Sequence, residues 1–169
     1  EEFRKQSIDS IKDSSANSNE WNPSNTFRDN WNTKLHLHVI DDSLIVQKCV
    51  IRQMSILTDI SWEDINAYSN AEEFLEKSKS LTFYDVILVD QNMECTGGVM
   101  KGTCLCNHLI KNGFNGMLII ITGNPEEASN ILKKSKNNDN ISIWTKPLPE
   151  PKKTMSVLSK FYEMKDNHF

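Results

Sequence analysis

From Leu35 onward, short apolar runs alternate with stretches in which apolar residues recur at helical spacing. Five short segments have the length and composition of β-strands. These segments are LHLHVI (35–40), EDINAYS (63–69), YDVILV (84–89), MLIIIT (117–122) and ISIWT (141–145). The pattern therefore predicts five strands, each separated from the next by another element.

A helical segment follows each of these strands. In SLIVQKCVIRQMSIL (43–57), Val46, Val50 and Met54 recur at close to the helical period, and Ser43 is a suitable N-cap. Another segment opens with Pro125, and proline is favoured at the first position of a helix. The predicted helices cover 43–57, 71–79, 102–112, 125–135 and 149–164.

Alternating strands and helices predict an α/β fold in which a five-stranded parallel sheet carries helices on both faces. The nearly continuous apolar character of 84–89 and 117–122 supports this, because a sheet exposed on one face would alternate. The first strand contains His36 and His38, which share a side with Ile40. We expect these histidines to lie near the rim of the sheet or to be hydrogen-bonded beneath a helix, rather than to bind a ligand.

Four of the predicted strands lead into polar side chains that can act together. They are Asp41 and Asp42 after the first strand, Asp90 after the third, Thr122 at the end of the fourth and Lys146 after the fifth. In an open α/β sheet, ligands bind just outside the carboxyl ends of the strands. We therefore expect three carboxylates, a hydroxyl and an ammonium group to converge on one pocket.

The charges in such a pocket point to its chemistry. Two carboxylates 4 Å apart repel each other by about 4 kcal/mol at an effective dielectric near 20. Because a hard divalent cation with oxygen ligands relieves this repulsion, the pocket is predicted to bind Mg²⁺. A phosphoryl group can then approach a carboxylate that acts as nucleophile. Thr122 and Lys146 are suited to hold phosphoryl oxygens, one as a hydroxyl donor and the other by its charge.

Composition narrows the classes of partner. The chain has 169 residues and a formal net charge of −4, with an isoelectric point of about 5.6. No broad basic surface is expected, so neither nucleic acid nor an anionic membrane is a predicted partner. No apolar run approaches the roughly 20 residues of a membrane-spanning helix. Because the chain begins with Glu1 rather than Met, we expect it to be a piece of a longer protein.

The chain divides into one domain and two short flanking parts. Residues 1–33 are rich in Ser, Asn, Asp and Lys and are predicted to be a polar linker or N-terminal extension. Trp21, Phe27 and Trp31 interrupt this composition and are candidates to dock on a folded module. The domain is expected over 34–166, with a C-terminal tail at 167–169.

The cysteines are few and lack the spacing of a disulfide framework, which fits a reducing, intracellular setting. They are Cys49, Cys95, Cys104 and Cys106. With His108, the last three offer possible zinc ligands, but paired CxxC motifs are missing. The favoured interpretation is a helix that carries small apolar thiols.

The motifs around the polar residues resemble those of response-regulator receiver domains of two-component and phosphorelay signalling. The matching stretches are VIDDS (39–43), VILVDQNM (86–93), IIITGN (119–124) and WTKPLP (144–149), and INAYSNAEEFLE (65–76) is similar to the family's second strand and helix. The resemblance covers about 35–164. It implies the (βα)5, flavodoxin-like, doubly wound arrangement of the five-stranded sheet.

The resemblance also implies roles for individual residues. Asp90 would accept a phosphoryl group, Asp42 would ligate Mg²⁺ directly and Asp41 would do so through water. Asp90 itself and the backbone carbonyl of Asn92 would complete the metal site. The sequence contains all four residues at the matching positions.

Two further residues of the motif have implied roles. Thr122 would swing toward the phosphoryl group, and Lys146 would pair with its oxygens. The Lys146–Pro147 bond would be a cis peptide, and the small Gly123 would leave room for the phosphodonor.

Three departures from the family pattern bear on access to the phosphorylation site, on the choice of donor and on signalling, and they leave the acceptor residues in place. Glu94 stands where family members usually have proline, and the loop ECTGGVMKG (94–102) is longer than usual. The aromatic residue expected three positions before the lysine is Ile143. The neighbouring Trp144 should face the other side of the sheet.

The predicted function is that of a phosphoacceptor signalling domain rather than an enzyme. It would take a phosphoryl group from a histidine kinase or a histidine-phosphotransfer protein and switch a partner-binding face. The favoured context is the C-terminal receiver of a hybrid histidine kinase, with a stand-alone regulator second. The expected location is cytoplasmic, or tethered there within a sensor kinase, and the oligomeric state stays open.

Two alternatives remain at this point. A pseudo-receiver would use the same fold only as a protein-interaction module, which Ile143 and the long loop leave open. A Mg²⁺-dependent phosphohydrolase of the aspartyl-phosphate type would need a second Asp two residues after the nucleophile. That position is Asn92.

Overall fold

A computed structural model describes residues 35–56, 62–133 and 139–166 of the chain. The predicted linker 1–33, with its three aromatic residues, and the tail 167–169 lie outside the described residues. None of the described helices is long and apolar enough to cross a membrane.

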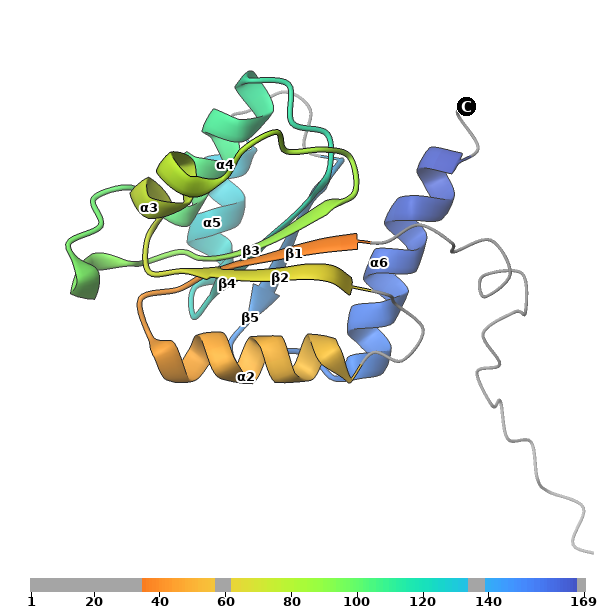
Figure 1. Ribbon diagram of the computed structural model, residues 1–169, viewed down its shortest axis with the longest axis horizontal. Helices are drawn as coiled ribbons and strands as arrows, with labels where there is room; N and C mark the ends of the chain where they lie inside the picture. The colour runs from red at the N-terminus through yellow and green to blue at the C-terminus, as the bar shows by residue number, and fades with distance from the viewer. Residues whose placement is uncertain (1–34, 57–61, 134–138, 167–169) are drawn as a thin grey trace, which may run out of the picture.

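Five parallel strands form one sheet, which confirms the predicted fold class (Figure 1). The strands are β1 (Leu35–Ile40), β2 (Trp62–Tyr68), β3 (Asp85–Asp90), β4 (Met117–Thr122) and β5 (Ile141–Thr145). Their order in the sheet is β2-β1-β3-β4-β5. The chain moves outward from β1 to β2 and then returns past β1 to β3, so the direction of winding reverses between β1 and β3. In folds of this kind, ligands bind at that reversal.

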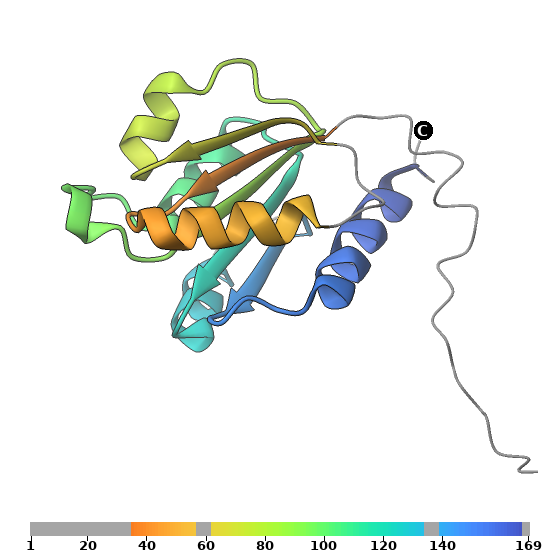
Figure 2. The same ribbon diagram turned by 60° about the horizontal axis from the view of Figure 1, so that its bottom comes forward.

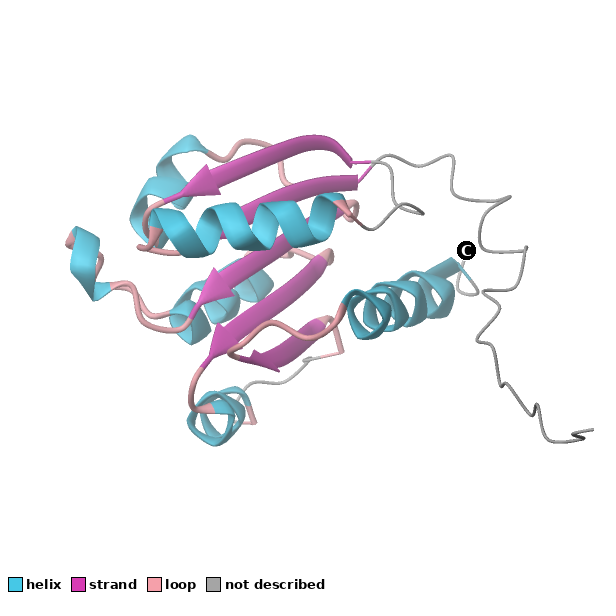
Figure 3. Cartoon of the chain, turned by 90° about the horizontal axis from the view of Figure 1, so that it is seen from below, coloured by secondary structure: helices cyan, strands magenta, loops and turns pink. Residues whose placement is uncertain are grey.

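Five α-helices and one short 3₁₀-helix accompany the described strands, and the last of the helices follows β5. They are α2 (Leu44–Ser55), α3 (Ala71–Lys77), η1 (Glu94–Thr96), α4 (Gly102–Lys111), α5 (Pro125–Leu132) and α6 (Pro151–Asp166). Helices α2 and α6 cover one face of the sheet, and α3, α4 and α5 cover the other (Figures 1 and 3). The element η1 lies beyond the arrowheads of the strands, at their carboxyl ends (Figure 2).

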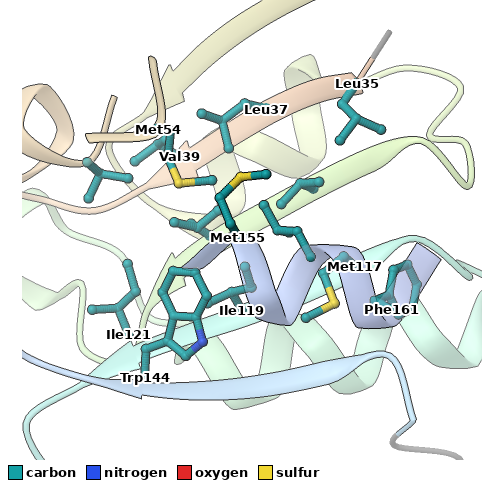
Figure 4. Close-up of a cluster of buried hydrophobic side chains, with 14 of the residues drawn as sticks. Leu35, Leu37, Val39, Met54, Met117, Ile119, Ile121, Trp144, Met155 and Phe161 are labelled. Carbon is teal, nitrogen blue, oxygen red and sulfur yellow. The ribbon is translucent and has the colours of Figure 1, made fainter. Parts of the chain in front are cut away.

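The alternation of side chains along the buried strands divides the core into two layers. In β3, Val86 and Leu88 face α2 and α6, whereas Ile87 and Val89 face the three other helices. Figure 4 shows part of the first layer, to which Trp144 of β5 and Met155 of α6 both belong. All six residues of β3 and of β4 are buried. This explains their nearly continuous apolar sequences.

Three of the predicted helices begin next to a residue whose side chain caps the helix. Ser43 Oγ accepts a hydrogen bond from the backbone N–H of Val46 at 3.4 Å. Asn70 and Asn124 cap α3 and α5 in the same way. The largest difference that matters for the site is in β3, which was predicted over 84–89 but runs from Asp85 to Asp90. Asp90 is therefore the last residue within a buried strand.

The two histidines of β1 are held by neighbouring side chains, as expected. The Nε2 atom of His38 lies 2.8 Å from Asp85 Oδ1, and its Nδ1 atom lies 3.3 Å from the hydroxyl of Tyr68. The ring packs edge-on against Phe74 of α3. His36 is half-buried, with Nε2 at 3.5 Å from Glu63 Oε2. His38 is thus a hydrogen-bonded core residue beneath a helix.

Candidate functional site at the carboxyl edge of the sheet

The predicted polar residues collect at one edge of the sheet because parallel strands end together there. Asp90, the last residue of β3, is paired in register with Ile121 of β4. Thr122 closes β4 beside Thr145 of β5. Lys146 follows directly, and its backbone N–H donates to the carbonyl of Thr122 at 3.0 Å.

The three acidic residues are gathered. One carboxylate oxygen from each of Asp41, Asp42 and Asp90 lies within 4.8 Å of those from the other two. Asp41 and Asp90 are 2% and 6% exposed, and Asp42 is half-buried. No other group of three or more acidic, histidine or cysteine side chains with this spacing occurs among the described residues.

Lys146 provides the positive charge of the site. Its Nζ atom lies 3.0 Å from Asp90 Oδ1 and 3.7 Å from Asp41 Oδ2. Burial alone would lower the pKa of Lys146, but the hydrogen bond to Asp90 and the charges of the three aspartates outweigh it. The pKa of Lys146 is therefore raised, and the amine stays protonated. One ammonium group faces three carboxylates, so negative charge remains in excess.

Asp41 has an oxygen that the described part of the chain leaves without a hydrogen bond. Its Oδ1 accepts from the backbone N–H of Ser43 at 2.8 Å, but its buried Oδ2 accepts none. Burial raises the pKa of Asp41, the negative charge of Asp90 adds to this, and the Ser43 hydrogen bond opposes it. A buried acceptor without a donor is costly. A cation would satisfy it.

The donor set fits magnesium. The gathered ligands are all carboxylate oxygens, and Mg²⁺ prefers a few carboxylates with water in its remaining positions. Asn92, the fourth predicted ligand residue, is exposed in the loop two residues after Asp90. The part assigned to its backbone carbonyl stays a prediction.

Thr122 is buried with its hydroxyl engaged on one side. Its Oγ1 atom accepts from the backbone N–H of Asn124 at 3.0 Å, and Asn124 in turn caps α5. Because a hydroxyl that accepts one hydrogen bond still has its own proton to donate, Thr122 can donate to an anion at this edge. Gly123 is exposed, and the structure leaves open space where a Cβ atom would stand.

Several residues that support the site were not singled out from the sequence. The buried amide of Gln47 donates to the carbonyls of Asp41 and Tyr68, at 2.7 and 3.0 Å, and so ties the ends of β1 and β2 together. A glutamine on the buried face of a helical pattern was the available signal. Gly102 begins α4 against Asp90, where an added Cβ would lie 2.5 Å from the Asp90 carbonyl oxygen.

The departures from the family pattern have clear structural counterparts. Ile143 is half-buried and packs with the layer beneath α3, α4 and α5. Trp144 is buried on the opposite face, as predicted, and its Nε1 donates to Ser142 Oγ at 3.0 Å.

The Lys146–Pro147 peptide, next to the lysine of the site, is cis, as the resemblance implied.

The weaker zinc hypothesis gains no support from the described residues. Cys106 is fully buried in the apolar layer, whereas Cys95 and Cys104 are exposed. Burial raises the pKa of Cys106 to about 12, which is the behaviour of an inert core thiol.

Comparison with solved structures places this fold among receiver domains. No protein-family profile matches the sequence, and no curated protein matches it. A response regulator from Colwellia psychrerythraea aligns with a TM-score of 0.54 at 20% identity, over 81% of this chain and 100% of the other. A CheY-like receiver domain from Methanospirillum hungatei gives 0.59 at 20%, over 80% and 99%. The BeF3-activated receiver domain of DrrB, a Thermotoga maritima response regulator, gives 0.58 at 16%, over 78% and 99%.

Because these sequence identities are low, the comparisons establish a similarity of fold. The chain has the CheY-like fold of response-regulator receiver domains, and the resemblance inferred from the motifs is confirmed at that level.

Proposed function

We propose that this chain is a receiver domain that accepts a phosphoryl group on Asp90 and thereby switches a partner-binding face. The donor would be a phosphohistidine on a histidine kinase or a histidine-phosphotransfer protein. One observation supports the proposal above the others. The buried carboxylate of Asp90 pairs with Lys146 at 3.0 Å, next to Asp41, whose buried Oδ2 accepts no hydrogen bond in the described part of the chain.

In the proposed reaction, an Asp90 carboxylate oxygen attacks phosphorus. The N–P bond of the phosphohistidine breaks, its electron pair stays on the imidazole nitrogen, and Asp90 becomes an acyl phosphate. Lys146 is protonated and would balance the charge of the phosphoryl oxygens. Thr122 would donate its hydroxyl proton to one of those oxygens.

Mg²⁺ is the cation that we assign to this site, with Asp41, Asp42, Asp90 and the carbonyl of Asn92 as the residues that would hold it. When bound, it would offset the excess negative charge and so favour the approach of an anionic phosphoryl donor. The oxygen-only donor set and the orphaned Oδ2 of Asp41 support this assignment.

The face that would change on phosphorylation comprises α5, β5 and α6. Ile143 occupies the β5 position where receivers carry an aromatic residue, so a rotating ring at this position cannot carry the signal. The contact from Thr122 to the N-cap residue Asn124 offers a direct connection from the site to α5.

The test is phosphorylation by a small donor. The chain is incubated with acetyl phosphate and Mg²⁺, and intact mass is followed for a single base-labile, acid-stable phosphoryl adduct. Asp90→Asn should abolish the adduct. Asp139→Asn removes the same charge from an exposed position just before β5, at the opposite edge of the sheet, and should retain it.

Each contrary result has a distinct meaning. No adduct from acetyl phosphate or phosphoramidate would contradict the proposal and favour a protein-interaction module. Rapid multiple turnover of acetyl phosphate would instead favour a phosphohydrolase. An adduct that survives in Asp90→Asn would mean that another side chain is the acceptor.

A further inference from the structure

The loop between β3 and α4 is extended but anchored at both ends. Met93, just before η1, is buried in the core, and Gly102, at the start of α4, packs against the backbone of Asp90. Between them, residues 94–101 project past the carboxyl edge of the sheet (Figure 2). We call residues 94–101 the extended loop.

The first contact that holds the extended loop reaches the acidic cluster itself. The backbone N–H of Cys95 donates to Asp42 Oδ2 at 2.9 Å. A fixed amide that binds one oxygen of a carboxylate restrains the orientation of the whole group. The loop therefore orients one of the three acidic side chains.

The second contact reaches α3. A single oxygen of Glu72, Oε1, accepts from the backbone N–H groups of Val99 and Met100 at 3.0 and 2.9 Å. The hydrogen bond from Val99 contributes most to lowering the pKa of Glu72, as expected for a carboxylate that is bound as an anion. Glu72 thus fixes the far arm of the loop.

The loop also fits closely against α3 between these two contacts. A Cβ atom added to Gly98 would lie 2.7 Å from the Met93 carbonyl oxygen and 2.9 Å from Asn70 Cβ. Gly97 has a positive φ of 78°, a conformation that glycine adopts without strain. Because these adjacent glycines give the free chain many conformations, fixed contacts are needed to hold the loop in one of them.

We propose that Glu72 is a positioning residue for the divalent-cation site, acting through the extended loop. Glu72 holds Val99 and Met100, the loop holds the Cys95 amide in place, and that amide orients Asp42. This inference rests on the proposed function, since it takes Asp41, Asp42 and Asp90 as the cation ligands. Residues that orient metal ligands typically change metal affinity by about 10–100-fold.

The experiment measures Mn²⁺ binding to the unphosphorylated chain by electron paramagnetic resonance, with Mg²⁺ competition. Glu72→Ala removes the acceptor and should weaken Mn²⁺ affinity by about tenfold. Glu72→Gln removes the charge but keeps an acceptor oxygen, and we expect an affinity within about twofold of the wild type. Glu76→Ala removes the same charge from an exposed position on α3 and should also stay within about twofold.

Amide hydrogen exchange gives a second readout that does not need a metal. Exchange at Cys95, Val99 and Met100 should become faster in Glu72→Ala, while exchange in the β3 core should not change. Unchanged exchange at Cys95 would overturn the proposed connection between Glu72 and Asp42.

The outcomes separate the two proposals. If the wild type binds Mn²⁺ and Asp41→Asn loses it, but Glu72→Ala binds as tightly as Glu76→Ala, only the role of Glu72 fails. If the wild type binds no Mn²⁺, or Asp41→Asn binds it equally well, the cation site fails and the role of Glu72 fails with it.

Discussion

Strand β3 begins and ends on a buried aspartate, and the two aspartates differ in which groups compensate their negative charge. Asp85 and Asp90 are 3% and 6% exposed, and both lie in the same central strand. Asp85 is surrounded by hydrogen-bond donors, whereas Asp90 shares its surroundings with two other carboxylates. The comparison shows which buried charge belongs to the scaffold and which belongs to a site.

Asp85 has a partner for each of its oxygens. Oδ1 lies 2.8 Å from His38 Nε2, and Oδ2 accepts from both the backbone N–H and the hydroxyl of Thr82. Burial by itself would raise the pKa of Asp85, but the hydrogen bonds from His38 and Thr82 together outweigh it and lower the pKa. The charge is compensated by groups of the chain itself, so it needs nothing from outside.

The opposite end of the strand lacks this compensation. Lys146 is the one cationic side chain with a described ion pair to Asp90, and it must also serve Asp41. Burial raises the pKa of Asp41, and one of its oxygens accepts no hydrogen bond in the part of the chain that the structure describes. Buried charge that is only partly compensated lowers the stability of the folded chain, and a ligand that binds there raises it again.

The largest expected effect on stability is at Asp85, the first residue of β3. Asp85→Ala should lower the free energy of unfolding by about 3–5 kcal/mol, because it leaves His38 and Thr82 without their buried acceptor. Urea unfolding followed by circular dichroism at pH 7 measures this. Asp64→Ala, at an exposed position of β2, should change stability by less than about 0.5 kcal/mol. Equal losses in the two variants would contradict the contrast between the strand ends.

A change of opposite sign is expected at the site. Asp41→Asn should raise the free energy of unfolding in EDTA by about 1–2 kcal/mol, a part of the roughly 3 kcal/mol repulsion between like charges 5 Å apart at an effective dielectric near 20. The asparagine keeps an oxygen for the Ser43 amide. Thermal and urea unfolding without metal measure the gain.

Added magnesium should narrow or close the difference in stability between these two proteins. At ten times its dissociation constant, Mg²⁺ stabilises a protein that binds it only when folded by about 1.4 kcal/mol. The wild type should gain this stability and Asp41→Asn should not. If magnesium stabilised both proteins equally, Asp41 would not be one of its ligands.

The smallest expected effect is on pH dependence. Because the native pKa of Asp85 is lowered, its contribution to stability is complete above its unfolded value of about 3.9 and is lost as pH falls through the native value. Wild-type stability should therefore fall below about pH 4, and the part due to Asp85 is on the order of 1 kcal/mol. Urea unfolding between pH 5 and pH 2 should show a shallower decline for Asp85→Asn. If stability fell equally in the wild type and in Asp85→Asn, Asp85 would not contribute to the loss of stability in acid.

The sequence predicted the fold and the gathering of the site because both follow from local patterns. Three strands, 35–40, 117–122 and 141–145, have the predicted bounds. Once the strands were parallel, Asp41, Asp90 and Thr122 had to meet at one edge, and the distances among the carboxylates agree with this.

Long-range pairing of polar side chains could not be predicted in the same way. Gln47 bridges two carbonyls that lie 6 and 21 residues from it, and Glu72 reaches amides 27 and 28 residues away. No periodicity marks such contacts, because they depend on how loops close over the finished sheet. The sequence drew attention to the length of the 94–102 loop but contained no sign of which residue would hold it.

The close packing of Gly102 on Asp90 has a consequence for how loops of different length can be accommodated here. With a Cβ atom excluded at 2.5 Å from the Asp90 carbonyl, α4 cannot slide along the strand to absorb extra residues. Met93 is equally fixed in the core on the other side. Insertions between them can only extend into solvent, so this loop can diversify among related chains while the backbone of Asp90 stays where it is.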